Sequence, residues 1–155
     1  MLAHPAHVLA LGFGSGLAPR APGTFGTLAA IPIAYALWTS TSDVVYLAFV
    51  LGLLFVGAWA AQRTGRALGV ADHGAIVVDE IVAFLLVLFF VGPAPLRIAF
   101  AFALFRLFDI VKPPPIRAID ARMKTGLGVM VDDIVAAGFA LVVYALVARL
   151  TGWPP

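Results

Sequence analysis

The sequence predicts an all-α fold, an integral membrane bundle of about five apolar helices in a single domain over residues 1–155. Of the 155 residues, 63% are hydrophobic and only 12% are charged, whereas soluble domains average roughly 25% charged residues. The mean hydropathy is +1.05. The apolar residues form unbroken runs that do not alternate with polar residues, and this pattern favours helices over a transmembrane barrel.

Five apolar segments account for the predicted helices. The second, at about 44–61, and the fifth, at about 131–150, approach the ~20 residues that a straight span needs. The other three are shorter, which leaves tilted or re-entrant arrangements open; they lie at about 24–38, 75–91 and 96–111.

Turn-forming sequences separate these segments. TSTSD at 39–43 is a polar turn with a helix start, and GPAP at 92–95 breaks the chain. KPPP at 112–115 ends the fourth helix, because proline lacks an amide donor and restricts the residue before it.

The basic residues predict how the bundle is oriented. If the segments alternate in direction, the N-terminal region and the 62–74 and 112–130 loops share one side, which collects most of the Lys and Arg residues. The positive-inside rule places that side in the cytoplasm. There, Arg117, Arg122 and Lys124 are expected to contact anionic lipid headgroups.

Composition excludes several classes of function. The formal net charge is only +2, and no face collects enough Lys and Arg to indicate nucleic-acid binding. The chain has no cysteine, which excludes disulfides, thiolate zinc sites and a cysteine nucleophile. The N-terminus has no basic region and only a short apolar run, so no cleaved signal peptide is expected.

Acidic residues form three knots within apolar sequence: Asp79 with Glu80, Asp109 beside basic residues, and Asp132 with Asp133. A charged side chain near a bilayer centre costs ~2.5–3.5 kcal/mol or more, and such residues are usually functional. Oxygen ligands without cysteine fit a hard cation such as Mg²⁺. The three knots together therefore predict a metal site at a membrane surface.

Each knot also has a structural interpretation. Asp79 and Glu80 could favour the dipole at a helix N-terminus, and a capping role would explain one of the two aspartates at 132–133 better than both. His73 is a candidate metal ligand or proton carrier, although a loop histidine is more often neither.

Arg106, Asp109 and Lys112 follow one another at spacings of three residues, so they share a helical face. One interpretation is an ion pair that neutralises Arg106 and Asp109 inside the bundle. The other is that Asp109 binds a cation while Arg106 or Lys112 binds a phosphate, which arginine matches bidentately and lysine as a point charge.

The stretch at 12–27 contains five glycines ahead of the first helix. Such a loop can present backbone amides to an anion, helped by the following helix N-terminus. Thr24 or Thr27 is expected to cap that helix. With Arg20, Gly23 and Thr24 as the candidate phosphate-binding residues, the stretch resembles a phosphate cradle, although a flexible loop at a membrane surface would look similar.

Four stretches together resemble the phosphatidylglycerophosphatase A family of bacterial membrane lipid phosphatases, in the family's order and over most of the chain. They are GSGLAPRAPGTFGTL at 14–28, DHGAIVVDEIV at 72–82, FRLFDIVKPPPIR at 105–117 and GVMVDDIVAA at 128–137. The chain has Ala83 and Ala137 where the family usually has glycine, which affects helix packing more than chemistry.

The resemblance implies Mg²⁺-dependent hydrolysis of phosphatidylglycerophosphate to phosphatidylglycerol and phosphate, at the cytoplasmic face of the bacterial inner membrane. Metal ligation is expected from Asp79, Glu80, Asp109, Asp132 and Asp133, with Asp79, Asp109 and Asp133 catalytic. Attack by a metal-activated water is preferred slightly over an aspartyl-phosphate intermediate. The sequence leaves open whether the protein forms a homo-oligomer.

Two rival functions use the same residue types. An ion or solute carrier could use the carboxylates as a cation site, but carriers usually show inverted repeats, and this sequence has no internal repeat. A CDP-alcohol phosphotransferase also uses aspartates and Mg²⁺, but its characteristic aspartate spacing is missing here.

Overall fold

The computed structural model describes residues 4–71, 73–122 and 125–153, and all regular structure in these ranges is helical. In chain order the helices are α1 (Pro5–Ala10), the 3₁₀ helix η1 (Gly12–Leu17), α2 (Pro22–Ser40), α3 (Asp43–Leu68), α4 (Val78–Val91), α5 (Pro95–Val111), α6 (Ile116–Arg122) and α7 (Gly126–Thr151). The predicted all-α fold is therefore confirmed.

The five long helices α2, α3, α4, α5 and α7 correspond to the five apolar segments, with two differences. α3 continues well past the predicted end and stops only at Gly69, whose φ of 74° suits glycine. Three short helices, α1, η1 and α6, occupy stretches that were expected to be loops. Helices of six or seven residues are too short to show a clear helical period of hydrophobic residues in the sequence.

By length and composition, two of the described helices could cross a membrane, α3 and α7, each of 26 residues. α4 has 14 residues, or about 21 Å of helix at ~1.5 Å per residue, which is less than the ~30 Å hydrocarbon core. The predicted membrane bundle of about five apolar helices, some of them short or re-entrant, therefore stays a prediction.

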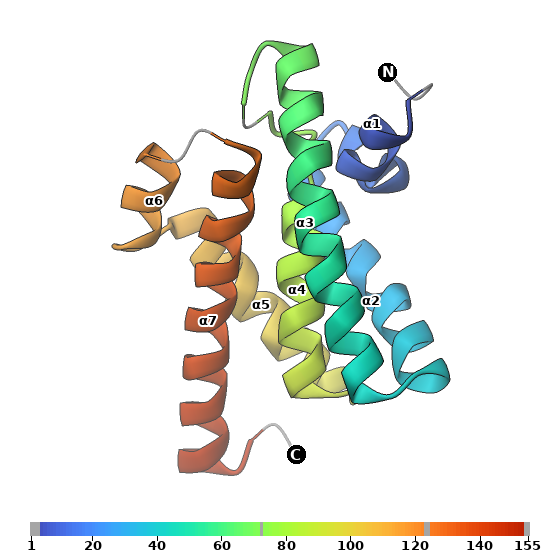
Figure 1. The fold of residues 1–155 in the computed structure, drawn as a ribbon. Helices are drawn as coiled ribbons and strands as arrows, with labels where there is room; N and C mark the ends of the chain where they lie inside the picture. The colour runs from blue at the N-terminus through green and yellow to red at the C-terminus, as the bar shows by residue number, and fades with distance from the viewer. Residues whose placement is uncertain (1–3, 72, 123–124, 154–155) are drawn as a thin grey trace.

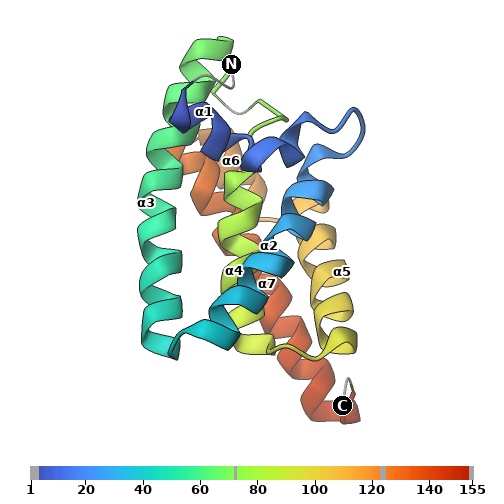
Figure 2. The ribbon, with the colours of Figure 1, turned by 90° about the vertical axis from the view of Figure 1, so that its right-hand side faces the viewer.

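Helix α4 lies at the centre of the bundle, with α2, α3, α5 and α7 around it (Figures 1 and 2). Most of its residues are buried, and Phe84 stacks on Phe105 of α5 with ring centroids 5.5 Å apart. On the α3 side, the Tyr46 hydroxyl donates to the Leu85 carbonyl oxygen at 2.9 Å. Every long helix therefore contributes to one core.

The helices alternate in direction along the bundle. α2, α4 and α7 begin at the upper end of Figure 1, where α3 and α5 finish, and α1 and α6 lie at this same end. The 39–43 and 92–95 turns lie at the lower end. The predicted gathering of the N-terminal region with the chain segments after α3 and α5 is therefore confirmed. We call this the upper end of the bundle.

The start of α7 is fixed by two contacts. The Thr125 hydroxyl caps the helix by accepting from the Gly128 amide at 3.1 Å, and Gln62 Oε1 of α3 accepts from the Gly126 amide at 2.6 Å. A Cβ atom on Gly126 would lie 2.1 Å from the carbonyl oxygen of Ala58, so α3 and α7 cross here at a distance that only glycine permits.

Candidate functional site

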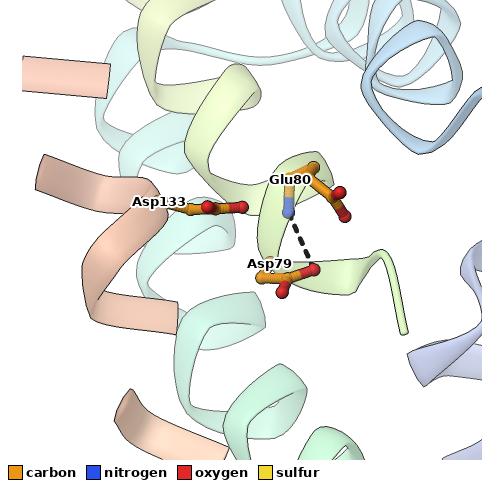
Figure 3. A group of neighbouring side chains, drawn as sticks. All are labelled: Asp79, Glu80 and Asp133. Carbon is orange, nitrogen blue, oxygen red and sulfur yellow. Dashed lines mark hydrogen bonds between the residues drawn. The ribbon is translucent and has the colours of Figure 1, made fainter. Parts of the chain in front are cut away.

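Three carboxylates meet at the upper end of the bundle. Asp79 and Glu80 come from the first turn of α4, and Asp133 comes from the second turn of α7 (Figure 3). Each offers an oxygen atom, and these oxygens lie within 4.8 Å of one another. Asp79 is 6% exposed and Asp133 4%. We call these three residues the carboxylate cluster.

Asp79 also has a local structural role. Its Oδ1 accepts from the Glu80 backbone amide at 3.0 Å, drawn as the dashed line in Figure 3, and the residue before α4 provides no side-chain cap. A carboxylate at this position favours the helix dipole. This interpretation does not extend to Asp133, because a residue in the second turn of α7 is past the capping positions.

Arg106 links the cluster to the third acidic knot. Its Nη1 donates to Asp109 Oδ2 at 2.6 Å and lies 3.7 Å from Glu80 Oε1. Asp109 is in turn one of the charged groups that surround Asp133. The ion pair between Arg106 and Asp109 that the sequence left as one alternative is therefore present, and it borders the carboxylate cluster.

Asp132 lies apart from the carboxylate cluster. Its Oδ2 accepts from Lys112 Nζ at 2.6 Å, and the group of ligand atoms within 4.8 Å includes Asp133 without it. Adjacent residues on a helix point ~100° apart, so Asp132 and Asp133 face different neighbours. Lys112, which follows the end of α5 in a left-handed conformation with φ of 45°, turns back to reach α7.

Two buried polar atoms beside the cluster have no hydrogen-bond partner among the described residues. They are Glu80 Oε2 and Arg106 Nε. Leaving such an atom unpaired costs roughly 1–3 kcal/mol, and more when the group is charged. One is an acceptor and the other is a donor, so the site has unused capacity for a cation and for an anion at adjacent positions.

The start of α2 closes over this site at Gly23. A Cβ atom on Gly23 would lie 2.0 Å from Glu80 Oε1 and 3.1 Å from Arg106 Nη1. A side chain at this position would require Glu80 or Arg106 to move. Of the predicted phosphate-binding residues, Gly23 therefore lies against the cluster, whereas Thr24 is half-buried one position on and Arg20 is exposed.

The expectation that Thr24 or Thr27 caps α2 is wrong. The residue before the helix is Ala21, with φ of 49° and no side-chain cap. Thr27 is instead fully buried, donates to the Gly23 carbonyl oxygen at 2.8 Å and accepts from Arg106 Nη1 at 3.4 Å. Its hydroxyl thus supports both residues, because it lies one helical turn after Gly23.

Most of the glycine-rich stretch does not form the expected amide cradle. It folds as η1, in which the amides of Gly14 and Gly16 donate to the Leu11 carbonyl oxygen at 3.0 Å each. Gly16 is needed for packing, since a Cβ there would lie 2.0 Å from the Ala75 carbonyl oxygen. η1 thus braces the chain just before α4.

The remaining candidates lie away from the cluster or outside the description. His73 is exposed, and its Nδ1 accepts from the Ala75 amide at 3.1 Å. Arg117 and Arg122 are exposed on α6, as contact with headgroups requires. Lys124 lies outside the described residues.

Two residues position the site in ways that the sequence did not predict: Thr27, which was expected only as a possible helix cap, and Gln62. Thr27 stands four residues after Gly23, and this spacing was the only signal for a shared helical face. Gln62 is a single polar residue near the end of an apolar helix. Its bond to the Gly126 amide depends on where α7 begins, which the sequence left uncertain.

The chain is similar to characterised families over most of its length. The family model for phosphatidylglycerophosphatase A matches residues 8–148. A phosphatidylglycerophosphatase A from Haemophilus influenzae is 43% identical, covering 92% of this chain and 88% of its own. One from Escherichia coli is 40% identical, covering 87% of this chain and 78% of its own.

A third relative carries a different name. A Bacteroides thetaiotaomicron protein, provisionally named a phosphatidylinositol-3-phosphatase, is 36% identical and covers 94% of both chains. No solved structure matches the fold. All three names describe removal of phosphate from a lipid headgroup.

Proposed function

The chain belongs to the phosphatidylglycerophosphatase A family, and from this premise we propose that it hydrolyses the terminal phosphate monoester of phosphatidylglycerophosphate. The products are phosphatidylglycerol and inorganic phosphate, and the reaction serves phospholipid synthesis. The observation that carries the proposal is the carboxylate cluster beside Arg106, at one end of a bundle that is otherwise apolar.

The residues present fit a divalent cation. Carboxylate oxygens from Asp79, Glu80 and Asp133 lie within 4.8 Å of one another, and Glu80 Oε2 is buried without a partner. Three such groups and no nitrogen or sulfur ligand favour Mg²⁺. When bound, such an ion supplies charge neutralisation and activation of water. Asp109 borders this group and Asp132 supports it through Lys112.

The basic residues supply the phosphate site in this proposal. Arg106 has an unpaired Nε next to the cluster, and a guanidinium can grip two phosphate oxygens at once. Gly23 lies against both Glu80 and Arg106 at the start of α2. Lys112 holds Asp132 at 2.6 Å and places a further positive charge on the same side, which favours the negative charge of the transferring phosphate.

Burial of the site affects how its carboxylates take up and release protons. Asp79, Asp109 and Asp133 lie in a crowded, water-poor environment in which like charges repel. A bound cation would relieve that repulsion. One of these carboxylates would accept a proton from the attacking water and give it to the leaving alkoxide oxygen, which becomes a hydroxyl of phosphatidylglycerol.

The enzyme works at the cytoplasmic face of the inner membrane in this proposal. Two helices are long and apolar enough to cross a bilayer, and most of the basic residues belong to the upper end, next to the carboxylate cluster. The positive-inside rule puts that end in the cytoplasm. Exposed Arg117 and Arg122 would contact anionic headgroups there.

Phosphate release from phosphatidylglycerophosphate by the purified protein tests the proposal. We expect release with Mg²⁺, none with EDTA, and a fall on the order of 10²–10³-fold in kcat for Asp133→Asn, since the loss of one group from a preorganised electrostatic site costs about that much. Asp43→Asn, at the start of α3 and remote from the cluster, is the matched control. No release by folded protein in lipid would contradict the proposal and favour a cation carrier, which ion-flux assays would detect.

The same assay decides between headgroups. Because one relative is named for phosphatidylinositol 3-phosphate, that lipid is the comparison substrate at equal surface concentration. A larger kcat/KM for it than for phosphatidylglycerophosphate would move the assignment to the inositol lipid while leaving the carboxylate cluster as the site.

A further inference from the structure

Two apolar hollows lie between α7 and the pair α3 and α4, and together we call them the α4–α7 groove. Its upper part has a volume of about 310 Å³ and is lined by Ile134 of α7, Val82 and Leu86 of α4, and four residues of α3. Its lower part, of about 420 Å³, lies between Phe90 of α4 and the Leu141–Ala145 region of α7. A third hollow of about 460 Å³ lies along α7 around Gly138.

These hollows follow one line along α7. Ile134, Gly138, Leu141 and Ala145 are spaced by four, three and four residues, so they form a single helical stripe. Val82, Leu86 and Phe90 form the matching stripe on α4. Both helices begin at the upper end (Figure 1), so the two stripes descend side by side from the carboxylate cluster.

The groove begins about one helical turn below the candidate site. Its first residue on α4, Val82, stands three positions after Asp79 and so shares a face of α4 with it. Its first residue on α7, Ile134, directly follows Asp133. From Ile134 to Ala145 the groove extends about 16 Å at ~1.5 Å per residue. One leaflet of the ~30 Å hydrocarbon core is about 15 Å thick. The groove therefore has the depth of one leaflet.

We propose that this groove holds one acyl chain of the phospholipid substrate, so that the lipid enters sideways from the bilayer and its headgroup reaches the carboxylate cluster. The inference rests on the proposed function. When the headgroup lies in the carboxylate cluster, the acyl chains of the same lipid lie directly below it. The apolar groove that starts at Ile134 and Val82 then receives one of these chains. Its walls include α3 and α7, the two candidate spans.

Gly138 lies beside the groove. It lines the third hollow, which shares Val142 with the lower part of the groove. The residue is exposed, and a Cβ built on it meets nothing within 4 Å. A larger side chain there would fill this hollow, next to the groove, without disturbing the core. Gly52 of α3 is also exposed and its Cβ also meets nothing within 4 Å, but it does not line the groove. The two glycines are a matched pair for substitution.

A second groove provides an internal comparison. It lies between α2 and α5, has a volume of about 380 Å³ and is lined by residues that include Leu28, Ala99 and Phe102. Near its lower end the Tyr35 hydroxyl donates to the Pro93 carbonyl oxygen at 2.9 Å. The proposal commits to the α4–α7 groove, and the other groove is tested as the competing outcome.

The experiment compares long-chain and short-chain substrates. Purified Gly138→Phe, Gly52→Phe and Ala99→Phe proteins are assayed on dipalmitoyl and dihexanoyl phosphatidylglycerophosphate in mixed micelles at fixed mole fraction. The readout is the ratio of kcat/KM for the two lipids, which does not depend on how much of each protein is folded. We expect Gly138→Phe to lower the ratio by ~10-fold or more, and both other variants to leave it unchanged.

Position along the groove gives a second, sharper readout. Gly138 lies about 7 Å below Asp133 and Ala145 about 18 Å below, at ~1.5 Å per residue. Ala145→Trp should therefore impair the dipalmitoyl lipid while sparing a dioctanoyl lipid, which Gly138→Phe impairs. If Gly138→Phe fails to fold, the contrast between the dipalmitoyl and dioctanoyl lipids in Ala145→Trp still tests the proposal.

The outcomes separate the two proposals. If the unmodified enzyme does not hydrolyse either lipid, the proposed function fails. If it hydrolyses both and the ratio is the same for Gly138→Phe, Ala145→Trp and Gly52→Phe, the groove proposal alone is overturned. A fall in the ratio for Ala99→Phe but not for Gly138→Phe overturns it in favour of the α2–α5 groove.

Discussion

Neighbouring acidic residues at this site have different surroundings. Asp133 faces Asp79 and Glu80, whereas Asp132 accepts from Lys112 at 2.6 Å. The pair at 79–80 is divided in a similar way, since Asp79 accepts from a backbone amide and Glu80 lies near Arg106. In both of these pairs, therefore, the two neighbouring carboxylates have different partners.

Gly23 provides the sharpest test at the scale of one residue. Gly23→Ala would place a methyl group 2.0 Å from Glu80 Oε1, so Glu80 or Arg106 has to move. Because misplacing a catalytic group by ~1 Å can cost ~10²-fold in rate, we expect kcat/KM to fall by about that factor. Phosphate release from phosphatidylglycerophosphate measures it.

The matched control for this change is Gly52→Ala, a helical glycine whose Cβ meets nothing within 4 Å. Its activity should stay unchanged, and its stability should rise by up to ~1 kcal/mol from helix propensity. Full activity of Gly23→Ala would contradict a role for the start of α2 in the site.

At the scale of elements, the helices were predictable and their rotations were not. Solid apolar runs predicted all five long helices, and the positions of the acidic knots predicted that they meet at one end. α7 is apolar on every side, so its sequence does not indicate which of Asp132 and Asp133 faces inward. That choice depends on how α7 packs on α3, at Gly126 and Gln62.

At this scale, the prediction from sequence was least accurate for the glycine-rich stretch. Glycines at 12, 14 and 16 were read as an anion cradle, but their neighbourhood forms η1 and packs on the backbone before α4. Glycine permits both a ligand's approach and another backbone's approach. Only the tertiary contact of Gly16 with Ala75 distinguishes the two.

The crossing of α3 and α7 should be the most sensitive helix contact. A Cβ on Gly126 would lie 2.1 Å from the Ala58 carbonyl oxygen and 2.6 Å from Gln62 Cβ. Overpacking of this kind costs ~1–3 kcal/mol, so Gly126→Ala should lower the Tm in detergent, as followed by circular dichroism. Gly138→Ala, in the same helix with nothing near its Cβ, should not lower it; equal losses would contradict the crossing.

At the scale of the whole molecule, charge crowding at one end links stability to metal binding. A ligand present at 100 times its Kd stabilises a protein by ~2.7 kcal/mol, so Mg²⁺ should raise the Tm. Asp133→Asn should abolish that rise. Without metal, the same variant should be more stable than the unmodified protein, because it removes one of several repelling carboxylates. A Tm that does not change when Mg²⁺ is added would contradict a metal site.

The polarity of the bundle gives a second prediction at this scale. The upper end carries the carboxylate cluster and most of the basic residues, and the positive-inside rule assigns it to the cytoplasm. The chain has no cysteine, so single cysteines report position without any background. Ser40→Cys lies at the lower end and Ala121→Cys lies on α6 at the upper end; both sites are exposed.

A membrane-impermeant maleimide applied to intact cells should label Ser40→Cys and leave Ala121→Cys unlabelled until the cells are opened. The physical reason is that two helices of 26 residues, each about 39 Å long at ~1.5 Å per residue, are long enough to cross the ~30 Å core. The two ends of a helix that crosses the core lie in different compartments. Labelling of Ala121→Cys alone would invert the bundle and place the carboxylate cluster outside. Labelling of both in intact cells would mean that the chain lies on one surface of the membrane, and the groove between α4 and α7 would then have no leaflet to match.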